Sequence, residues 1–382
     1  MEITPVYFHT KAFASETVNT YWKIKLHFRL KKRERYLQAL VLKRICDLKV
    51  ERQPLEIADV PLPTAGPGEI VIEVGACGIC HTEIDEIEGR TPPPLFPVIP
   101  GHQVVGKVVE RGEGVQKWQL GDRVGVGWIF SACGECPWCL SEQENLCPEF
   151  RATGRDAHGG YGEFMKIGAD FAVPIPDAFS DCEAAPFLCA GAIGYRSLRL
   201  TCLQDGQTLG LTGFGASAHL VLKMVRYLYP RTAVFVFARS EGERDFAREL
   251  GAVWAGDTAA RPPELLDAVV DTTPAWRPVV TALGNLKPGG RLVINAIRKE
   301  GADREVLLDL DYPRHLWLEK EIKSVANVTR RDIREFLALA AALPIRPEFR
   351  EYSLAEANSA LIELKEQRIR GAKVLKLKND GI

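Results

Sequence analysis

Short apolar runs, separated by glycine- and proline-rich turns, fill the chain from about residue 37 to residue 126. The clearest of them are residues 39–42, 55–60, 69–74 and 104–110. Each run is bounded by turn signals and has a length typical of a strand. The pattern therefore predicts a β-rich domain in this part of the chain.

A different pattern begins at Gln207, where strand-like runs alternate with helix-length segments. The strands predicted there are residues 208–212, 233–237, 268–271 and 291–295. Strands that alternate with helices form a doubly wound parallel sheet with helices on both faces. The predicted fold class is therefore α/β, with a β-rich domain and a parallel-sheet domain.

The first of these strands runs into Gly213-Phe-Gly215-Ala-Ser-Ala218, a G-x-G-x-x-A turn followed by a helix predicted to reach about Tyr229. A turn of this kind between a strand and a helix binds a dinucleotide, because the pyrophosphate rests on the helix N-terminal amides. We expect Gly213, Gly215 and Ala218 to line it. The alternative is a glycine-rich turn in some other α/β domain.

Composition narrows the class of protein. The 382 residues suit two domains. The 49 Lys plus Arg nearly balance the 50 Asp plus Glu, so net charge does not favour binding to nucleic acid or to an anionic membrane. No apolar stretch is long enough to span a bilayer or form a signal-peptide core, so we expect a cytoplasmic protein with small-molecule partners. Residues 23–35 are basic and belong to a predicted extension; a nucleic-acid arm or an organelle address is the alternative reading.

Ten cysteines in such a setting are more typical of thiols or metal ligands than of disulfides. Cys133, Cys136, Cys139 and Cys147 have C-x2-C-x2-C-x7-C spacing, which suits a closed, four-thiolate structural zinc. An iron–sulfur cluster is the competing interpretation, but ferredoxin runs place three residues, not seven, before the fourth cysteine.

A second metal site is indicated by Cys80 and His102, which follow glycine-marked turns beside two predicted strands. A catalytic zinc typically has three protein ligands and one open position. Cys189 is the candidate third ligand, although a cysteine in an apolar helix is as often core. The other thiols lack partners at metal spacing, and we expect them to be ordinary cysteines: Cys46, Cys77, Cys182 and Cys202.

From about Leu37 to Lys378 the chain resembles a zinc-dependent alcohol dehydrogenase of the medium-chain dehydrogenase/reductase superfamily. The C-G-I-C-H-T segment, the G-H segment, the four-cysteine lobe, the C-A-G helix and the glycine turn occur in the family's order. The resemblance implies a GroES-like catalytic domain at 37–187 and 324–382 and a Rossmann domain at 188–323. Residues 1–36 lack a clear period, and we expect them to form a disordered extension. The resemblance also implies two zinc ions per chain: a catalytic one bound by Cys80, His102 and Cys189, and a structural one in the lobe.

The same resemblance implies reversible hydride transfer between a primary or secondary alcohol and a nicotinamide cofactor. Thr82 would take the substrate proton, His81 would lie near the pyrophosphate, and Glu83 would orient the His102 ring. Lys373 matches a basic position near the pyrophosphate.

Three residues depart from the family pattern. Gln103 replaces a glutamate beside the histidine ligand, and Ile193 replaces a threonine that packs on the nicotinamide. Asp85 stands where many members have the relay histidine, so the final proton acceptor is either this carboxylate or water.

Cofactor choice depends on the end of the second parallel strand. Counted back from the family-like helix end at 249–252, the position of the acid that binds the NAD ribose falls on Ala238, followed by Arg239 and Ser240. A small residue followed by arginine and serine leaves room for a 2′-phosphate, which favours NADP over NAD. The alternative is a solvated Arg239 beside NAD.

Other functions remain open at this stage: a polyol dehydrogenase, a zincless quinone or enoyl reductase of the same superfamily, and a zinc-stabilised binding protein without turnover. The metal ligands and Thr82 argue against the reductase, and the glycine turn argues against the binding protein. Trp128 and Phe130 either line the substrate pocket or belong to the core. We expect a homodimer or homotetramer.

Overall fold

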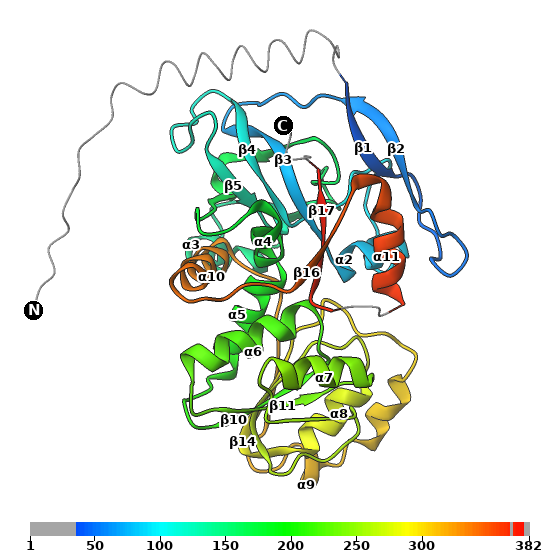
Figure 1. The fold of residues 1–382 in the computed structure, drawn as a ribbon, viewed down its shortest axis with the longest axis vertical. Helices are drawn as coiled ribbons and strands as arrows, with labels where there is room; N and C mark the ends of the chain where they lie inside the picture. Colours follow the sequence, from blue (N-terminus) through cyan, green and yellow to red (C-terminus); the bar gives the residue numbers. More distant parts are fainter. Residues whose placement is uncertain (1–35, 367–369, 378–382) are drawn as a thin grey trace, which may run out of the picture.

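The computed structural model describes residues 36–366 and 370–377, which form two lobes, one above the other in Figure 1. The upper lobe is β-rich, and the lower lobe holds a parallel sheet flanked by helices. This arrangement confirms the predicted fold class. The proposed domain boundaries at residues 187 and 323 stay a prediction, and the extension with its basic run at 23–35 lies outside the described residues.

The β-rich lobe is built on a seven-stranded sheet in the described part of the chain, with order β16-β17-β3-β4-β5-β9 and with β8 also pairing with β3. Two smaller sheets, β1 with β2 and β6 with β7, lie beside it. The strands of this lobe are β1 (Tyr36–Leu42), β2 (Leu55–Pro61), β3 (Glu69–Ile79), β4 (Val104–Arg111), β5 (Arg123–Val126), β6 (Ile129–Ser131), β7 (Arg151–Ala152), β8 (Phe164–Gly168), β9 (Ala172–Pro174), β16 (Phe349–Tyr352) and β17 (Ala372–Lys376).

Strand β3 corrects one expectation, because the glycine-marked segment before Cys80 is strand and not turn. Gly78 pairs with Val374 of β17 and Cys77 pairs with Val104 of β4, so partners on both sides satisfy the backbone hydrogen bonds. The strand ends at Ile79, and helix α2 (His81–Ile87) begins two residues later. Cys80 is therefore held at the junction of a central strand and a helix.

The lower lobe contains a six-stranded parallel sheet of described residues, in the order β12-β11-β10-β13-β14-β15. Its strands are β10 (Thr208–Thr212), β11 (Ala233–Phe237), β12 (Trp254–Gly256), β13 (Leu266–Asp271), β14 (Leu286–Ile294) and β15 (Glu321–Ser324). The sequence predicted four of them. It missed β12, which has three residues, and β15, which is exposed throughout and lacks an apolar run.

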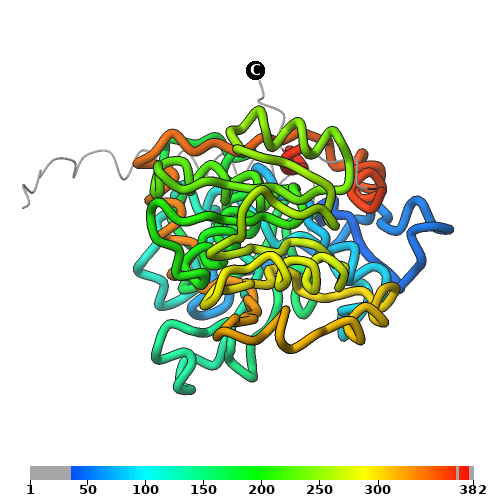
Figure 2. The backbone as a smooth tube through the Cα atoms, turned by 90° about the horizontal axis from the view of Figure 1, so that it is seen from below, coloured from blue at the N-terminus to red at the C-terminus, as the bar shows by residue number. Residues whose placement is uncertain are grey.

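Both faces of this sheet are covered by helices. Val234 and Val236 of β11 pack into one core with α5 and α6, whereas Phe235 and Phe237 point to the opposite core with α8. Figure 2 shows the sheet and its helices from below, with the β-rich lobe behind them. The helices of this lobe are α5 (Ala190–Thr201), α6 (Ala216–Leu228), α7 (Glu241–Glu249), α8 (Arg277–Gly284), η4 (Arg304–Asp309) and α9 (Tyr312–His315).

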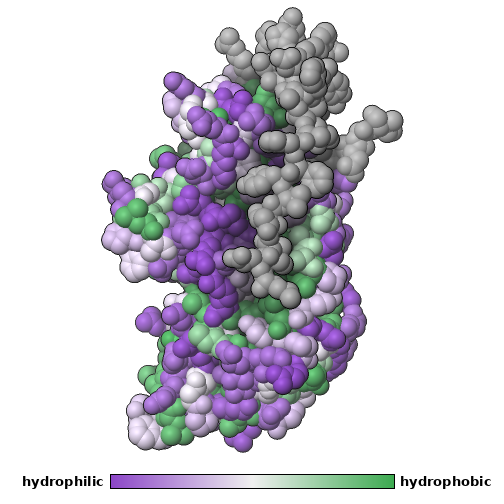
Figure 3. All heavy atoms as spheres, turned by 90° about the vertical axis from the view of Figure 1, so that its left-hand side faces the viewer, coloured by the Kyte–Doolittle hydropathy of each residue, from purple (hydrophilic) through white to green (hydrophobic). Residues whose placement is uncertain are grey.

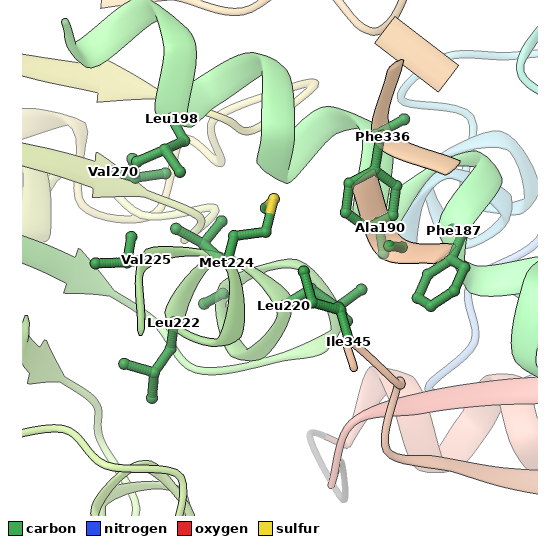
Figure 4. Packing of buried hydrophobic residues seen from close by; sticks show 14 of the residues in the cluster. Phe187, Ala190, Leu198, Leu220, Leu222, Met224, Val225, Val270, Phe336 and Ile345 are labelled. Atoms are coloured by element: carbon green, nitrogen blue, oxygen red, sulfur yellow. The ribbon is translucent and has the colours of Figure 1, made fainter. Parts of the chain in front are cut away.

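A shared core connects the two lobes where α5 and α6 meet α10 (Figure 4). The rings of Phe187 and Phe336 lie edge to face with centroids 5.2 Å apart, and both are fully buried. This contact anchors the chain two residues before Cys189. The remaining helices are α3 (Pro137–Leu140), η1 (Glu144–Leu146), η2 (Ala169–Phe171), α4 (Asp181–Ala184), η3 (Ala185–Leu188), α10 (Arg330–Ala342), η5 (Leu354–Glu356) and α11 (Ala357–Lys365).

The surface drawn in Figure 3 is mainly hydrophilic, with hydrophobic residues scattered over it. Among the described residues, no helix has the length and apolar character needed to cross a membrane. The cytoplasmic location stays a prediction.

Candidate active site and metal centres

The structure brings together the three residues expected to bind a catalytic metal. Cys80 directly follows β3, His102 lies just before β4, and Cys189 lies between η3 and α5. One potential ligand atom from each residue lies within 4.8 Å of the others, and His102 and Cys189 are buried. Segments more than 100 residues apart thus converge on one point with two thiols and an imidazole.

Cys189 was expected inside a continuous buried helix, and the structure corrects this. The helix is broken there: η3 ends at Leu188, Cys189 has a non-helical backbone with φ −130° and ψ −74°, and α5 begins at Ala190. The break gives the thiol a position at a helix end, outside the regular helical surface.

Glu83 contacts two of the three candidate ligand residues, His102 and Cys80. One of its oxygens lies 2.6 Å from Nδ1 of His102, and the other accepts the backbone N–H of Cys80 at 2.7 Å. The side chains of Glu83 and His102 are buried. Burial alone would lower the pKa of His102, but the Glu83 charge raises it well above its ordinary value. This contact is the one that the implied orienting role of Glu83 requires.

The chemistry of the three-residue group fits a metal ion. Glu83 occupies Nδ1, and Nε2 of His102 is buried without a hydrogen-bond partner among the described residues. A buried ring nitrogen without a partner is costly unless it binds something. The pKa of Cys80 is held well below its ordinary value, mainly by the neighbouring Cys189 thiol and to a smaller extent by His102. Cys80 is therefore suited to bind a metal as a thiolate.

Three residues of α2 were expected to handle protons or the cofactor. The Thr82 hydroxyl is buried and lies 3.6 Å from the Cys80 sulfur. His81, one residue earlier, is exposed. Asp85 forms an ion pair with Arg90 at 2.5 Å, yet burial raises its pKa from the ordinary value despite this cation. All three side chains therefore extend from α2, the helix that begins directly after Cys80.

The four cysteines of the lobe also converge, with all four sulfurs within 4.8 Å of one another. The Cys133 sulfur lies 3.8 Å from that of Cys139 and 3.5 Å from that of Cys147. Backbone N–H groups of Glu135 and Cys136 lower the pKa of Cys133 to about 7. A tetrahedron with Zn–S bonds of about 2.3 Å has edges of about 3.8 Å, so one zinc ion fits this group.

The glycine turn has the geometry needed to bind a dinucleotide. Gly213 has φ +79°, and a Cβ there would lie 2.7 Å from the Thr272 hydroxyl, so only glycine fits. A Cβ at Gly215 would meet no atom within 4 Å, which leaves open space in front of α6. Helix α6 begins at Ala216, and Ala218 is buried beneath the turn. Its first amides are therefore free to bind the pyrophosphate.

The end of β11 carries the residues expected to choose the cofactor. Ala238 is buried, and Arg239 and Ser240 are exposed. The Arg239 guanidinium has no ion pair with any residue that the structure describes. Ser240 caps α7 by accepting the N–H of Glu243 at 3.2 Å. The strand end thus presents a free cation and no carboxylate at the position of Ala238.

The structure does not join Lys373 to the glycine turn. Its ammonium is buried and, in the described part of the chain, bonds to the hydroxyl of Tyr352 and the carboxylate of Glu363, each at 2.5 Å. Trp128 is buried 5.1 Å from the ring of Phe150, and Phe130 is partly buried against the core.

Sequence reasoning missed Arg244, which fixes the strand end. Its guanidinium donates to the carbonyls of Ala238 and Arg239 at 2.8 and 2.9 Å, and it also pairs with Glu241 at 2.6 Å. An arginine facing a glutamate three residues earlier on a helix was the available signal. It pointed to a helix ion pair and not to a role at the strand end.

Comparison with known proteins identifies the sequence relatives of this chain. Residues 66–177 match the family model for the alcohol dehydrogenase GroES-like domain. The chain is 43% identical over 327 residues to a protein of Mycobacterium tuberculosis described as "Probable alcohol dehydrogenase", covering 84% of this chain and 92% of that protein. It is 32% identical to an alcohol dehydrogenase of Geobacillus stearothermophilus, covering 86% of this chain and 97% of the relative.

A solved structure shares the fold. A protein of Helicobacter pylori described as "CAD", complexed with NADP(H), superposes with a TM-score of 0.80 at 21% identity, covering 91% of this chain and 99% of that one. This structure shows the fold, and the sequence relatives identify a zinc-dependent enzyme that uses a nicotinamide cofactor to interconvert alcohols and carbonyl compounds. The chain belongs to the zinc-dependent alcohol dehydrogenases of the medium-chain dehydrogenase/reductase superfamily.

Proposed function

We propose that this alcohol dehydrogenase holds two zinc ions per chain, a catalytic one at Cys80, His102 and Cys189 and a structural one at the four-cysteine lobe. The observation that carries this proposal is the contrast between the two groups. The first offers three ligands and leaves a fourth position for substrate, whereas the second offers four thiolates and closes the shell.

The proposed mechanism uses Thr82 as the first proton acceptor. A zinc ion held by Cys80, His102 and Cys189 would polarise the substrate oxygen, and a bound nicotinamide would supply the hydride acceptor or donor. The Thr82 hydroxyl, 3.6 Å from the Cys80 sulfur, is next to the place where that oxygen must lie. It accepts the hydroxyl proton of the alcohol and donates its own proton onward. Glu83 keeps the His102 ring in the ligand orientation throughout.

Asp85 is the proposed end of the proton path. It follows Thr82 on the same helix, and burial raises its pKa, which favours a proton on this carboxyl more than on an exposed aspartate. Arg90 holds it in place. The alternative acceptor is water, and Asp85→Asn distinguishes the two because only a carboxylate acceptor changes the pH profile of alcohol oxidation.

Zinc is favoured over an iron–sulfur cluster in the lobe. The sulfur separations of 3.5 and 3.8 Å agree with the edges of one tetrahedron about 3.8 Å long. In a two-iron or four-iron cluster the four thiolates are divided among different irons, so they do not all lie at the edges of one tetrahedron around a single metal. The proposed zinc therefore acts as a closed staple that links the ends of the lobe.

NADP is the proposed cofactor in preference to NAD. Arg239 is exposed, and the two glutamates that could compete for it have other partners. Glu241 pairs with Arg244 at 2.6 Å and with Arg248 at 3.0 Å, and Glu243 accepts a hydrogen bond from the Ser240 hydroxyl at 2.8 Å. These contacts leave the Arg239 guanidinium available for a 2′-phosphate.

We also propose a homodimer formed through β15, with a homotetramer assembled from such dimers as the larger alternative. This edge strand is exposed along its whole length, with Ile322 46% exposed. An unpaired edge with exposed apolar neighbours is suited to pairing with a second copy. Sedimentation should show a dimer or tetramer, and Ile322→Lys should shift it towards the monomer; a monomeric parent would refute the proposal.

The experiment that tests the function is a panel of alcohols and aldehydes assayed with NADP and NAD on the zinc-containing enzyme. We expect turnover of primary or secondary alcohols, faster with NADP. Activity confined to polyols would favour the polyol dehydrogenase reading. Reduction of quinones or enones that survives removal of the metal would contradict the zinc mechanism.

A further inference from the structure

A buried ion pair joins Lys299 to Asp271 at the carboxyl ends of the parallel strands, where the cofactor turn also lies. The side chain of Lys299 is 8% exposed and that of Asp271 is fully buried. The Lys299 ammonium also donates to the carbonyls of Thr273 at 2.7 Å and Ala275 at 3.1 Å. An ammonium has three hydrogens, so these contacts use its whole donor capacity.

The carboxylate of Asp271 is bonded to the strand that leads into the glycine turn. Its second oxygen accepts the hydroxyl of Thr212 at 2.5 Å and that of Thr273 at 2.8 Å. Thr212 is the last residue of β10 and directly precedes Gly213. The carboxylate therefore lies one residue away from the turn that receives the pyrophosphate.

The segment that carries Lys299 also contacts the first turn of α6. The Asn295 amide donates to the Ser217 hydroxyl at 3.2 Å, and Ser217 belongs to the G-x-G-x-x-A turn. The neighbouring Thr272 donates its hydroxyl to the Thr212 carbonyl at 2.9 Å. The chain after β13 and the chain after β14 are thus both bonded to the residues that form the cofactor turn.

Charge gives this arrangement a functional consequence. A buried carboxylate without a partner is unfavourable by itself, and it also repels a second negative group nearby. The cofactor brings two phosphates to the turn beside Asp271. Lys299 neutralises the charge of Asp271 beside the site of the cofactor phosphates. Its three N–H donors are used by Asp271 and two backbone carbonyls, so the cofactor is not hydrogen-bonded to Lys299 itself.

We propose that Lys299 is a positioning residue for the dinucleotide, which neutralises Asp271 and holds the chain after β13 so that the glycine turn accepts the pyrophosphate. The pyrophosphate is common to NAD and NADP. The proposal therefore rests on the established use of a nicotinamide cofactor and not on the preference for a 2′-phosphate.

The test compares Lys299→Met, Asp271→Asn and the double variant in the zinc-containing full chain. Dissociation constants for NADH and NADPH are measured by fluorescence titration, and melting temperatures are measured in parallel. Lys299→Met should raise both dissociation constants about tenfold, because the Asp271 charge is left uncompensated. Asp271→Asn should leave them unchanged or lower them, because an unpaired ammonium attracts phosphate. The double variant should return to within about twofold of the parent.

A merely structural role predicts a different result. Both single variants would then weaken cofactor binding in step with their loss of melting temperature, and the double variant would not recover. That outcome, or unchanged binding in Lys299→Met, would overturn the proposal. If Lys299→Met does not fold, Asp271→Asn decides alone, since a tenfold weaker binding of NADH and NADPH in this variant contradicts the electrostatic role.

Discussion

One oxygen of Glu83 lies 2.6 Å from Nδ1 of His102, and the other oxygen of the same carboxylate accepts the backbone N–H of Cys80 at 2.7 Å. A single buried side chain therefore fixes two of the three residues that converge on the proposed catalytic zinc. One residue comes from the end of β3 and the other from the chain before β4, so Glu83 links two segments of the site.

Replacing Glu83 by glutamine should loosen the catalytic metal. The amide keeps the size of the side chain but removes the charge that supports the imidazole, and losses of about 10- to 100-fold in metal affinity are typical of such changes. Zinc release into a chelator measures the effect. Glu113→Gln is the matched control, because Glu113 is exposed and lies two residues after the end of β4. Equal zinc retention in both variants would show that Glu83 does not support the site.

Thr82→Val should lower kcat by about 10²- to 10⁴-fold, the usual contribution of a positioned proton-transfer group. Zinc content and cofactor affinity should stay unchanged, because valine nearly keeps the shape of the buried side chain. Thr82→Ser retains the hydroxyl and should retain most of the activity. Similar kcat values for the valine and serine variants would assign Thr82 to packing alone.

The four-cysteine group was predictable because its ligands come in one short motif. The four lobe cysteines lie within 15 residues, and their spacing alone predicts convergence. Cys189 was uncertain because its position depends on a break between η3 and α5 that the apolar pattern does not reveal. The glycine turn was visible because its conformation and its function both require small residues at fixed positions.

Contacts between distant segments were not predictable. Lys299 and Asp271 are 28 residues apart, Asp271 at the end of β13 and Lys299 in the loop after β14, and no sequence pattern links the two positions. Lys373 reads as a free cation in the sequence, but folding of α11 places Glu363 beside it. Strand β15 has no apolar alternation because its side chains are exposed, so its pairing with β14 becomes apparent only in the sheet.

Arg239→Ala should reduce the preference for NADP over NAD. A charge-assisted contact to the 2′-phosphate contributes about 1.5 to 3 kcal/mol, which corresponds to a roughly tenfold to hundredfold change in the ratio of kcat/KM values. Arg44→Ala is the control, because Arg44 is 79% exposed in the other lobe. A parent enzyme that prefers NAD, or a preference for NADP that survives in Arg239→Ala, would refute the assignment.

His219 should make the cofactor domain sensitive to acid. It is fully buried, and burial lowers its pKa from 6.5 to about 4. The neutral ring accepts the backbone N–H of Glu348 through Nε2 at 3.2 Å, and its Nδ1 lies 3.2 Å from the carbonyl of Gly215. Because the pKa is lower in the folded state, the stabilisation is complete above pH 6.5 and is lost as the pH falls towards 4.

The expected loss by pH 5 is roughly 2 kcal/mol of unfolding free energy from this group. Urea unfolding at pH 7.5 and pH 5 measures it in the parent and in His219→Gln, whose amide does not titrate. The parent should lose about 2 kcal/mol more than the variant between these pH values. The same loss in both proteins would show that His219 does not couple folding to protonation.

The most direct test of the two-site account is the zinc content of the purified protein, measured by elemental analysis alongside Cys189→Ser and Cys139→Ser. The account predicts two zinc ions per chain in the parent, since the structure forms one open three-ligand group and one closed four-cysteine group. Each variant should lose one ion, and only Cys189→Ser should keep the structural ion while losing alcohol oxidation. A parent with a single zinc ion, or with iron in place of zinc, would contradict the account.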